Sequence, residues 1–332
     1  MPFPAAPEIE VPRGFVAQVY ARGLHRPTAL AFGPDGRLYA TEDEVGRVIA
    51  VRPLDDEPEV VITDLTVPLG LAWRGSDLYV SSQGRVDRFP FADSRPTDRV
   101  AIATGLPFGL HQQNNVVIGP DGRLYLGNGS TCDACVEADP RSATVLSFAL
   151  DGSDPRIVAR GLRNPFGLAF DPLTGRLYAT VNAVDRTGST TEPDAADTLV
   201  ELRLDAHYGW PDCFAGARGR ALVGACEGVT PPLAMLEEHS SPDGLVVYRA
   251  EAFPVEYRGG IFIATWGQYF EETHGRTIVF VGLDASGALT GATTFARGFA
   301  HPLAVAVDDD GALLVADWER GVVYRIQAEG GR

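Results

Sequence analysis

Apolar and polar residues alternate at period two in short segments that recur along the chain. One copy, Thr28 to Glu42, contains an apolar run, a Pro-Asp-Gly turn and a second apolar run. Such alternation predicts half-buried β-strands, and the glycine supplies the positive φ that a tight hairpin requires. Further copies are Leu69 to Ser82, Asn114 to Asn128, Phe166 to Asn182 and Leu303 to Trp318, with a more diverged copy at Asp243 to Gly267.

Six hairpins spaced roughly 40 to 55 residues apart predict an all-β fold, a six-bladed β-propeller with about four strands in each blade. The repeat covers nearly the whole chain, so we expect residues 1–332 to form one propeller domain. Loop insertions are expected near residues 131–143, 185–198 and 206–240. A strand near Gly14 to Tyr20 is expected to pair as the outer strand of the blade formed by Leu303 to Ile326, because closing the ring removes free sheet edges.

The topology of a propeller predicts which residues meet at one mouth of its channel. The innermost strand of each blade lines the channel and the second strand runs antiparallel to it, so the start of the first and the end of the second share a face. This mouth is concave and polar, as a small-molecule site requires, although solvation alone also favours polar residues there. The residues gathered in this way include Arg26, Asp43, His111, Gln112, Arg163, Asn164, Asn182, Asp185, Asp243, Trp266, Gln268, His301, Asp317 and Trp318.

Two of these residues carry chemistry. His111 can accept a proton near neutral pH, and Arg163 can hold a permanent positive charge beside a developing oxyanion. They therefore form a candidate base and electrophile. The sequence contains no Gly-x-Ser-x-Gly elbow and no Walker loop, so serine nucleophiles and phosphoryl transfer have no support.

Charge and composition exclude several classes of partner. The chain has 44 acidic and 28 basic residues and a formal net charge of −16, which disfavours nucleic acids and anionic membranes as partners. Every basic residue is an arginine, so Schiff-base chemistry through a lysine is excluded. No apolar run is long enough to span a membrane.

The four cysteines form two local pairs, each in an insertion. Cys132 with Cys135 and Cys213 with Cys226 predict two loop-closing disulfides, with free thiols or a metal site as the alternatives. Disulfides indicate an oxidising compartment, so we expect a periplasmic or secreted protein. The first residues lack the basic and apolar regions of a signal peptide. Asn128-Gly129-Ser130 matches the glycosylation sequon, a weakly specific pattern.

Five segments resemble the soluble glucose/sorbosone dehydrogenase family, and most closely its sorbosone dehydrogenase-like branch. They are VPRGFVAQVYARGLHRPTALAFGPDGRLY, HQQNNVVIGPDGRLYLGNGSTCDAC, ARGLRNPFGLAFDPLTGRLYAT, HYGWPDC and HSSPDGLVVYRAEAFPVEYRGG, which together cover most of the chain. Members of this family are six-bladed propellers that oxidise sugars with pyrroloquinoline quinone (PQQ) and calcium. The resemblance therefore implies oxidation of an aldose or a related sugar or polyol, with transfer of electrons to an acceptor.

The resemblance also assigns roles to particular residues. His111 matches the family's catalytic base, which takes the proton of the sugar hydroxyl as hydride passes to the quinone carbon. Arg163 matches the arginine that stabilises charge on the quinone oxygens. Further cofactor contacts are implied for Gln112, Asn164, Asn182, Gln268 and His301, and calcium binding for Ala183, Val184 and Asp185.

The chain departs from the family in its positive charges. PQQ carries three carboxylates, but Ile263 to Gln268 offers no lysine and Gly298 to Pro302 offers only His301 where arginines are expected. Val184 occupies the position of an arginine in the sorbosone-like branch. Calcium, with Arg258, Arg276 or Arg320, is the candidate compensating charge, since unpaired buried carboxylates are costly.

Two other functions remain open. A propeller that has lost the quinone would act as a sugar-binding or scaffold module. A calcium-dependent lactone or ester hydrolase would also have a metal and a histidine at a channel mouth.

Overall fold

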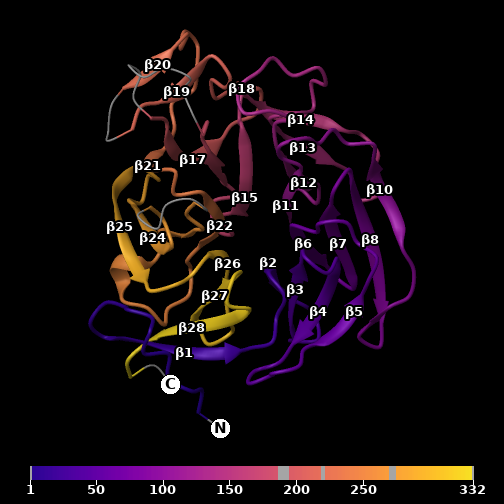
Figure 1. Ribbon diagram of the computed structural model, residues 1–332, viewed down its shortest axis with the longest axis vertical. Helices are drawn as coiled ribbons and strands as arrows, with labels where there is room; N and C mark the ends of the chain where they lie inside the picture. Colours follow the sequence, from indigo (N-terminus) through magenta and orange to yellow (C-terminus); the bar gives the residue numbers. More distant parts are fainter. Residues whose placement is uncertain (1, 186–193, 218–220, 269–273, 331–332) are drawn as a thin grey trace.

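Six antiparallel sheets are arranged around a central axis in the computed structural model (Figure 1). The structure describes residues 2–185, 194–217, 221–268 and 274–330. The regular secondary structure of the described residues consists of β-strands and one 3-10 helix, η1 (Val255–Tyr257). The prediction of an all-β, six-bladed propeller is confirmed.

The first three blades use the first half of the chain. Blade 1 consists of β2 (Pro27–Phe32), β3 (Leu38–Glu42), β4 (Arg47–Val51) and β5 (Glu59–Ile62). Blade 2 consists of β6 (Gly70–Arg74), β7 (Asp77–Ser82), β8 (Arg85–Ala92) and β10 (Val100–Thr104), with β9 (Arg95–Pro96) paired to β8. Blade 3 consists of β11 (Gln113–Ile118), β12 (Leu124–Asn128), β13 (Thr144–Phe148) and β14 (Arg156–Arg160), with β18 (Ala206–His207) parallel to β14.

The remaining blades follow in the same way. Blade 4 consists of β15 (Asn164–Phe170), β16 (Leu177–Asn182), β17 (Ala196–Leu202) and β21 (Ala234–Glu238). Blade 5 consists of β22 (Pro242–Val247), β23 (Ile261–Thr265), β24 (Thr277–Leu283) and β25 (Leu289–Arg297). Blade 6 consists of β26 (Pro302–Val307), β27 (Leu313–Asp317), β28 (Val322–Ala328) and β1 (Phe15–Ala21). A separate hairpin contains β19 (Cys213–Ala215) and β20 (Leu222–Gly224).

Each predicted repeat is the inner hairpin of one blade. The six innermost strands β2, β6, β11, β15, β22 and β26 lie nearest the centre, and each contacts the next around the ring (Figure 1). Two of these strands approach closely at Gly167, where a Cβ would lie 2.1 Å from the carbonyl oxygen of Asp243. At this position the neighbouring strand therefore leaves no room for a residue larger than glycine.

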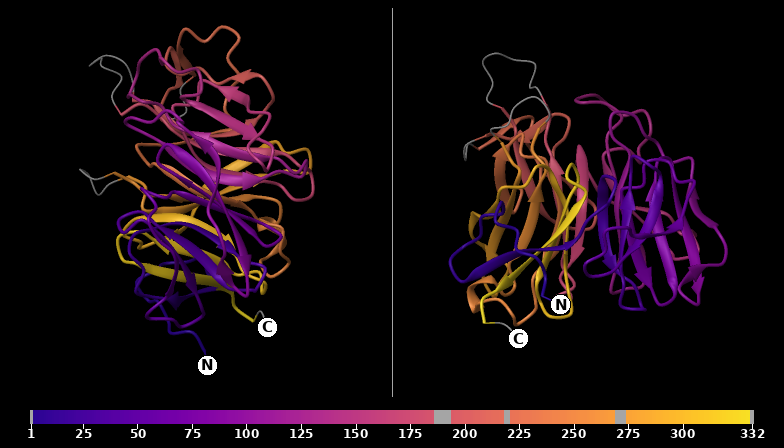
Figure 2. Two further views of the ribbon diagram at one scale, coloured as in Figure 1. Left: turned by 90° about the vertical axis from the view of Figure 1, so that its right-hand side faces the viewer. Right: turned by 60° about the horizontal axis from the view of Figure 1, so that its bottom comes forward.

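The N-terminal strand closes the ring, as predicted. β1 pairs antiparallel with β28, with Phe15 opposite Ala328 and Val19 opposite Tyr324. The two ends of the chain consequently lie close together (Figure 2). Buried aromatic side chains fill the space between the last two blades, among them Phe15, Phe253 and Phe295.

The hairpin turns carry a repeated polar contact. In blade 1, Asp35 accepts hydrogen bonds from the Arg37 backbone N–H (3.1 Å) and the Tyr39 hydroxyl (2.9 Å). In blade 3, Asp121 accepts the same two bonds from Arg123 (3.1 Å) and Tyr125 (2.9 Å). The recurring Pro-Asp-Gly-Arg-Leu-Tyr sequence is thus explained by the turn it forms. No helix of the described residues is long and apolar enough to cross a membrane.

Candidate functional site

A cavity of about 440 Å³ lies where the predicted channel-mouth residues converge. This volume is in the range of small-molecule sites, about 300 to 1,000 Å³. The predicted residues that line it are Asp43, His111, Gln112, Arg163, Asn164, Asn182, Asp185, Asp243, Trp266 and Trp318. Residues that the topology did not single out complete the lining, including Thr28, Leu110, Asn114, Phe166 and Ser241.

Ser130 determines which ring nitrogen of His111 carries the proton. His111 Nδ1 lies 2.9 Å from Ser130 Oγ and 3.2 Å from the Ser130 carbonyl oxygen. The Ser130 hydroxyl donates its own proton to the Cys132 carbonyl (2.7 Å). Both neighbours of Nδ1 are therefore acceptors, so Nδ1 is protonated and Nε2 is left as the nitrogen that can take a proton.

The surroundings of His111 keep its ring neutral. Burial and the neighbouring Arg163 guanidinium lower the pKa of His111 to about 3, against a smaller opposing effect of the Ser130 carbonyl. The ring is accommodated by Gly129, where a Cβ would lie 2.4 Å from the His111 Cβ. The His111 ring is consequently neutral at every physiological pH, and its Nε2 is free to accept a proton.

Arg163 is buried and paired with two carboxylates. Its side chain is 3% exposed, and Nη2 lies 2.7 Å from Asp133 Oδ1 and 2.9 Å from Asp185 Oδ2. Its Nε donates to the Asp133 carbonyl (3.2 Å). The positive charge of Arg163 is therefore already balanced within the chain.

A directed row of amide side chains runs along the channel mouth. Asn114 Nδ2 donates to Asn164 Oδ1 (2.7 Å), and Asn164 Nδ2 donates to Asn182 Oδ1 (2.9 Å). Asn182 Nδ2 then lies 3.4 Å from Asp243 Oδ1. Each amide is oriented by its neighbour, so three blades hold one another in register at the cavity. Gln112, also in the lining, donates to the Val67 carbonyl (3.2 Å).

Two carboxyl groups near this row are fully buried. Burial raises the pKa of Asp197 to about 6, although the backbone N–H groups of Ala183 and Ser241 donate to it. Burial and the charge of Asp197 raise the pKa of Asp243 well above its usual value. Asp43, which accepts a bond from Trp318 Nε1 (3.2 Å), also has a pKa raised by burial. The mouth is an acidic environment and is suited to a cation.

The segment predicted to bind calcium borders this acidic region. The Ala183 N–H donates to Asp197, and the Asp185 N–H donates to Asp133 Oδ1 (2.9 Å). Within the described ranges, no hydrogen bond reaches the carbonyl oxygens of Ala183 or Val184. Carbonyl and carboxylate oxygens are the ligands that Ca²⁺ prefers, so this donor set fits calcium. The Val184 side chain is buried against Ala143, Ala195 and Trp210.

Aromatic side chains form one wall of the cavity. Phe166, Trp266, Leu303 and Trp318 pack together in one cluster. His301 lies behind this wall, stacked on Trp266 with ring centroids 3.9 Å apart and its Nδ1 2.8 Å from the Trp266 carbonyl oxygen. The Nε2 atom of Gln268 lies 3.3 Å from His274 Nδ1. Neither Gln268 nor His301 is among the described residues that line the cavity, so their cofactor contacts stay predictions.

The other candidate cations also lie outside the lining. Arg26 lies over the Trp318 ring at 4.4 Å and pairs with Glu44. Arg258 donates to the carbonyls of Phe253 and Glu251, and Arg320 donates to the Gly298 carbonyl. Arg276 is absent from the lining as well. Among the lining residues that the structure describes, Arg163 is the one arginine.

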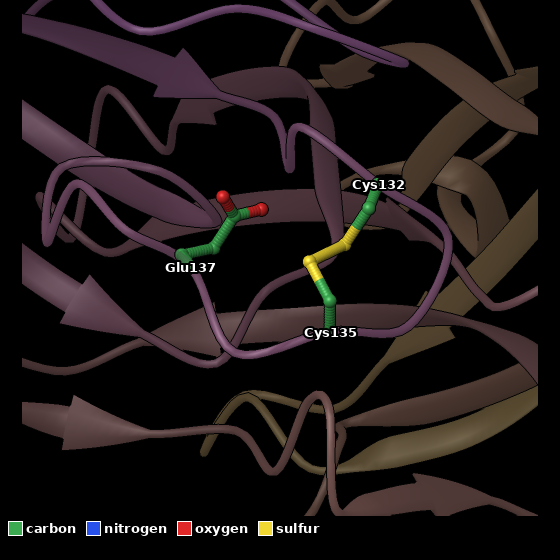
Figure 3. Close-up of side chains that lie close together, drawn as sticks. All are labelled: Cys132, Cys135 and Glu137. Atoms are coloured by element: carbon green, nitrogen blue, oxygen red, sulfur yellow. A yellow bond between two sulfur atoms is a disulfide. The ribbon is translucent and has the colours of Figure 1, made fainter.

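Both predicted disulfides are present. Cys132 is bonded to Cys135 and Cys213 to Cys226. Figure 3 shows Cys132, Cys135 and Glu137 together in one loop. The Sγ atoms of the two cysteines and a carboxylate oxygen of Glu137 lie within 4.8 Å of one another. The sulfurs are bonded to each other, and Glu137 accepts hydrogen bonds from the Thr131 N–H and hydroxyl (2.6 Å each). This cluster therefore closes a loop and offers no thiolates to a metal.

The insertions adjoin the site where they are described. The first and third insertions meet where Trp210 Nε1 donates to the Asp133 carbonyl (3.0 Å). Most of the second, residues 186–193, lies outside the described residues. A smaller, mainly apolar cavity of about 50 Å³ lies between the third insertion and blade 4, with Arg163 in its lining.

Sequence reasoning missed the residues that hold the site residues in place. Ser130 was considered only within a glycosylation sequon, but Asn128 and Ser130 are completely buried, so this sequon is no glycosylation acceptor. Asp133 and Asp197 lie outside the hairpin repeat. The one signal that pointed toward Asp133 was its position inside the Cys132 to Cys135 motif.

Comparisons with known proteins show relatives in sequence and in fold. The chain is 26% identical over 264 residues to quinoprotein glucose dehydrogenase B of Acinetobacter calcoaceticus, a match that covers 60% of this chain and 52% of that protein. It is similar in fold to the holo form of the pyranose dehydrogenase PQQ domain from Coprinopsis cinerea, with a TM-score of 0.82, 18% identity and 98% of both chains covered.

A third similar structure is the PQQ-bound form of aldose sugar dehydrogenase from Streptomyces coelicolor. Its TM-score is 0.71 at 21% identity, with 99% of this chain and all of that chain covered. At these identities the solved structures show a shared fold. The model of the Glucose / Sorbosone dehydrogenase family matches residues 85–325, which is more than half of the sequence. The chain therefore belongs to the Glucose / Sorbosone dehydrogenase family.

Proposed function

We propose that the protein oxidises a hydroxyl group of an aldose or a related sugar or polyol, using PQQ and calcium held at the channel mouth. One observation carries the proposal: an unprotonated His111 Nε2 and a buried Arg163 guanidinium border one cavity of small-molecule size. Membership of the family and similarity to proteins described as PQQ-containing sugar dehydrogenases support it.

The shape and the charge of the cavity place different demands on the cofactor. The aromatic wall formed by Phe166, Trp266 and Trp318 suits a flat ring system. PQQ carries three carboxylates, whereas Arg163 is already paired with Asp133 and Asp185. Calcium at the oxygens of Ala183, Val184 and Asp185 is therefore needed to supply the missing positive charge, which makes the fit conditional on that ion.

Each residue has a role that follows from its contacts. When bound, PQQ with calcium supplies a two-electron acceptor for the hydride of the sugar carbon. His111 Nε2 accepts the proton of the sugar hydroxyl, with Nδ1–H held by Ser130. The Arg163 guanidinium would stabilise negative charge that develops on the bound cofactor. Asn164 and Asn182, which belong to the row of amide side chains, would orient polar groups of the cofactor. The aromatic wall would exclude water from the cavity.

The disulfides bear on where this reaction takes place. Two disulfides and no free cysteine among the described residues are typical of an oxidising compartment. We propose a periplasmic or secreted location, and a separate electron acceptor that takes the electrons from the protein.

Reconstitution tests the proposed function. The purified protein is loaded with PQQ and calcium, and reduction of an artificial dye is followed with a panel of aldoses and polyols. We expect sugar-dependent dye reduction by the wild type and at least a ~10²-fold lower rate for His111→Ala. Sugar binding without dye reduction would favour a binding module. Calcium-dependent lactone hydrolysis without dye reduction would favour a hydrolase.

A further inference from the structure

The ring closed by the Cys132–Cys135 disulfide is in direct contact with the site. Asp133, inside this ring, contacts Arg163 twice: its carbonyl accepts from Nε (3.2 Å) and its Oδ1 lies 2.7 Å from Nη2. The same carbonyl accepts from Trp210 Nε1 (3.0 Å), and Oδ1 accepts from the Asp185 N–H (2.9 Å). One residue thus joins the arginine, the third insertion and the segment proposed to bind calcium.

The ring also reaches His111. The Cys132 carbonyl accepts the Ser130 hydroxyl (2.7 Å), and this hydroxyl in turn faces His111 Nδ1 (2.9 Å). The Ser130 N–H donates to the Arg163 carbonyl (2.7 Å). Two carbonyl groups of the ring, those of Cys132 and Asp133, therefore fix the hydrogen bonds on which the base and the cation depend.

A backbone carbonyl can orient a partner only if its own peptide plane is fixed. Residues 131–137 are an insertion outside the strands, so no sheet ladder holds these planes. The disulfide closes the segment over a sequence separation of three, and Glu137 binds Thr131 at its base. The disulfide and the Glu137–Thr131 hydrogen bonds therefore restrict this backbone, which no strand pairing restricts. Functional side chains keep a precise geometry only when the groups that contact them are themselves rigid.

We propose that the Cys132–Cys135 ring is the positioning element of the site, in which Asp133 holds the Arg163 guanidinium and the Cys132 carbonyl holds the Ser130 hydroxyl against His111. Asp133 and Ser130 are positioning residues: they act through Arg163 and His111. The consequence for turnover rests on the proposed function, whereas the consequence for the order of Arg163 does not.

Two variants separate the parts of the ring. Asp133→Asn keeps the disulfide and the carbonyl and removes the carboxylate, and Cys132→Ser/Cys135→Ser keeps Asp133 and opens the ring. We expect each to lower turnover on the order of 10- to 100-fold, the loss typical of displaced catalytic groups. We also expect Asp133→Glu to recover more turnover than Asp133→Asn, because it restores the charge opposite Arg163.

Matched controls come from the same loops. Asp139→Asn removes a carboxylate of the same insertion, which pairs with Arg141 (2.7 Å). Cys213→Ser/Cys226→Ser removes the other disulfide, and no hydrogen bond from the described residues of that ring reaches His111 or Arg163. We expect both controls to keep the turnover of the wild type.

A second readout needs neither cofactor nor substrate. The signal of the Arg163 Nε–H is followed in 15N–1H correlation spectra of the cofactor-free protein. It is assigned as the signal that disappears in Arg163→Met. In the wild type this N–H is buried and bonded to the Asp133 carbonyl, so its exchange with water is slow. Opening of the ring in Cys132→Ser/Cys135→Ser should accelerate this exchange at least about tenfold, with no change in the two controls.

The two readouts distinguish the two proposals. A wild type without dehydrogenase activity refutes the proposed function, while accelerated exchange in the ring variants still supports the positioning role. Unchanged turnover in both Asp133→Asn and the opened ring, or unchanged Nε–H exchange in the opened ring, would overturn the inference. An equal loss in the Cys213→Ser/Cys226→Ser control would also overturn it. If the opened ring fails to fold, Asp133→Asn decides by itself.

Discussion

Aspartates at the two ends of the inner hairpins, the turn edge and the channel-mouth edge of the blades, have opposite environments. At the hairpin turns, hydrogen bonds from Arg37 and Tyr39 outweigh the effect of burial and lower the pKa of Asp35 to about 2. At the channel mouth, burial and the neighbouring Asp197 raise the pKa of Asp243 well above its usual value. The same residue type is stabilised as a carboxylate at one edge and destabilised at the other.

This difference separates structural from functional residues. The turn contacts of Asp35 recur at Asp121, so they follow the repeat and stabilise the hairpin. Asp243 has no equivalent contact, and a buried carboxyl without strong donors costs stability. Ionisable groups with such displaced pKa values cluster at functional sites. The acidic mouth is therefore interpreted as a site in which a cation is part of the functional state.

The largest expected effect is on turnover, which should depend on the channel-mouth edge and not on the turn edge. His111→Ala should lower turnover at least ~10²-fold, because the proton acceptor is lost, while PQQ affinity changes little. Asp121→Asn, at the turn edge, should leave turnover unchanged. Steady-state kinetics of the reconstituted enzyme measure both. Equal loss in the two variants would show that turnover reports stability and not the site.

The next effect distinguishes the edges by stability. Asp35→Ala removes the acceptor of three hydrogen bonds, from the Arg37 backbone N–H, the Arg37 Nε–H and the Tyr39 hydroxyl, so we expect a loss of about 1–3 kcal/mol in the free energy of unfolding. Turnover per folded molecule should not change. Denaturant unfolding with parallel activity assays tests this, and lower turnover without lower stability would place the turn in the functional site.

The pH dependence of stability should differ between the edges in sign. Asp243 is protonated in the folded state above the pH at which it ionises in the unfolded chain, so the folded state binds more protons and stability falls as pH rises from about 4. Asp243→Asn removes this loss. Its stability relative to wild type should therefore improve as pH rises, by up to ~1.4 kcal/mol per pH unit. A constant difference from pH 4 to 7 would contradict the raised pKa.

The smallest effect concerns His111, which should not titrate in the physiological range. With a pKa of about 3 against about 6.5 in the unfolded chain, the unfolded state binds more protons between these values. Neutral His111 thus contributes stability that is present above pH 6.5 and lost as pH falls toward 3. Imidazole NMR signals of His111 should stay constant between pH 5 and 8. A midpoint near 6.5 would show an exposed or charge-paired ring.

The parts of the molecule that repeat were predictable from the sequence. Period-two alternation gave the six inner hairpins, and the need to close the ring gave the pairing of β1 with β28. Local spacing gave both disulfides. Strand direction then brought His111, Arg163 and Asp243 to one cavity without any knowledge of side-chain contacts.

The remaining contacts depend on backbone that does not repeat. Ser130 and Asp133 act through an insertion whose peptide planes no periodic pattern specifies. His301 directly precedes β26, as expected, yet its ring stacks on the Trp266 indole and is not among the described residues that line the cavity.

Titration calorimetry of the purified protein with PQQ tests the central claim, that the channel mouth is a quinone site whose positive charge is completed by calcium. Arg163 is the one arginine among the described lining residues, and it is paired with Asp133 and Asp185. The account predicts PQQ binding in millimolar calcium, abolished by excess chelator. Tight binding in excess chelator, or no binding at millimolar calcium, would contradict it.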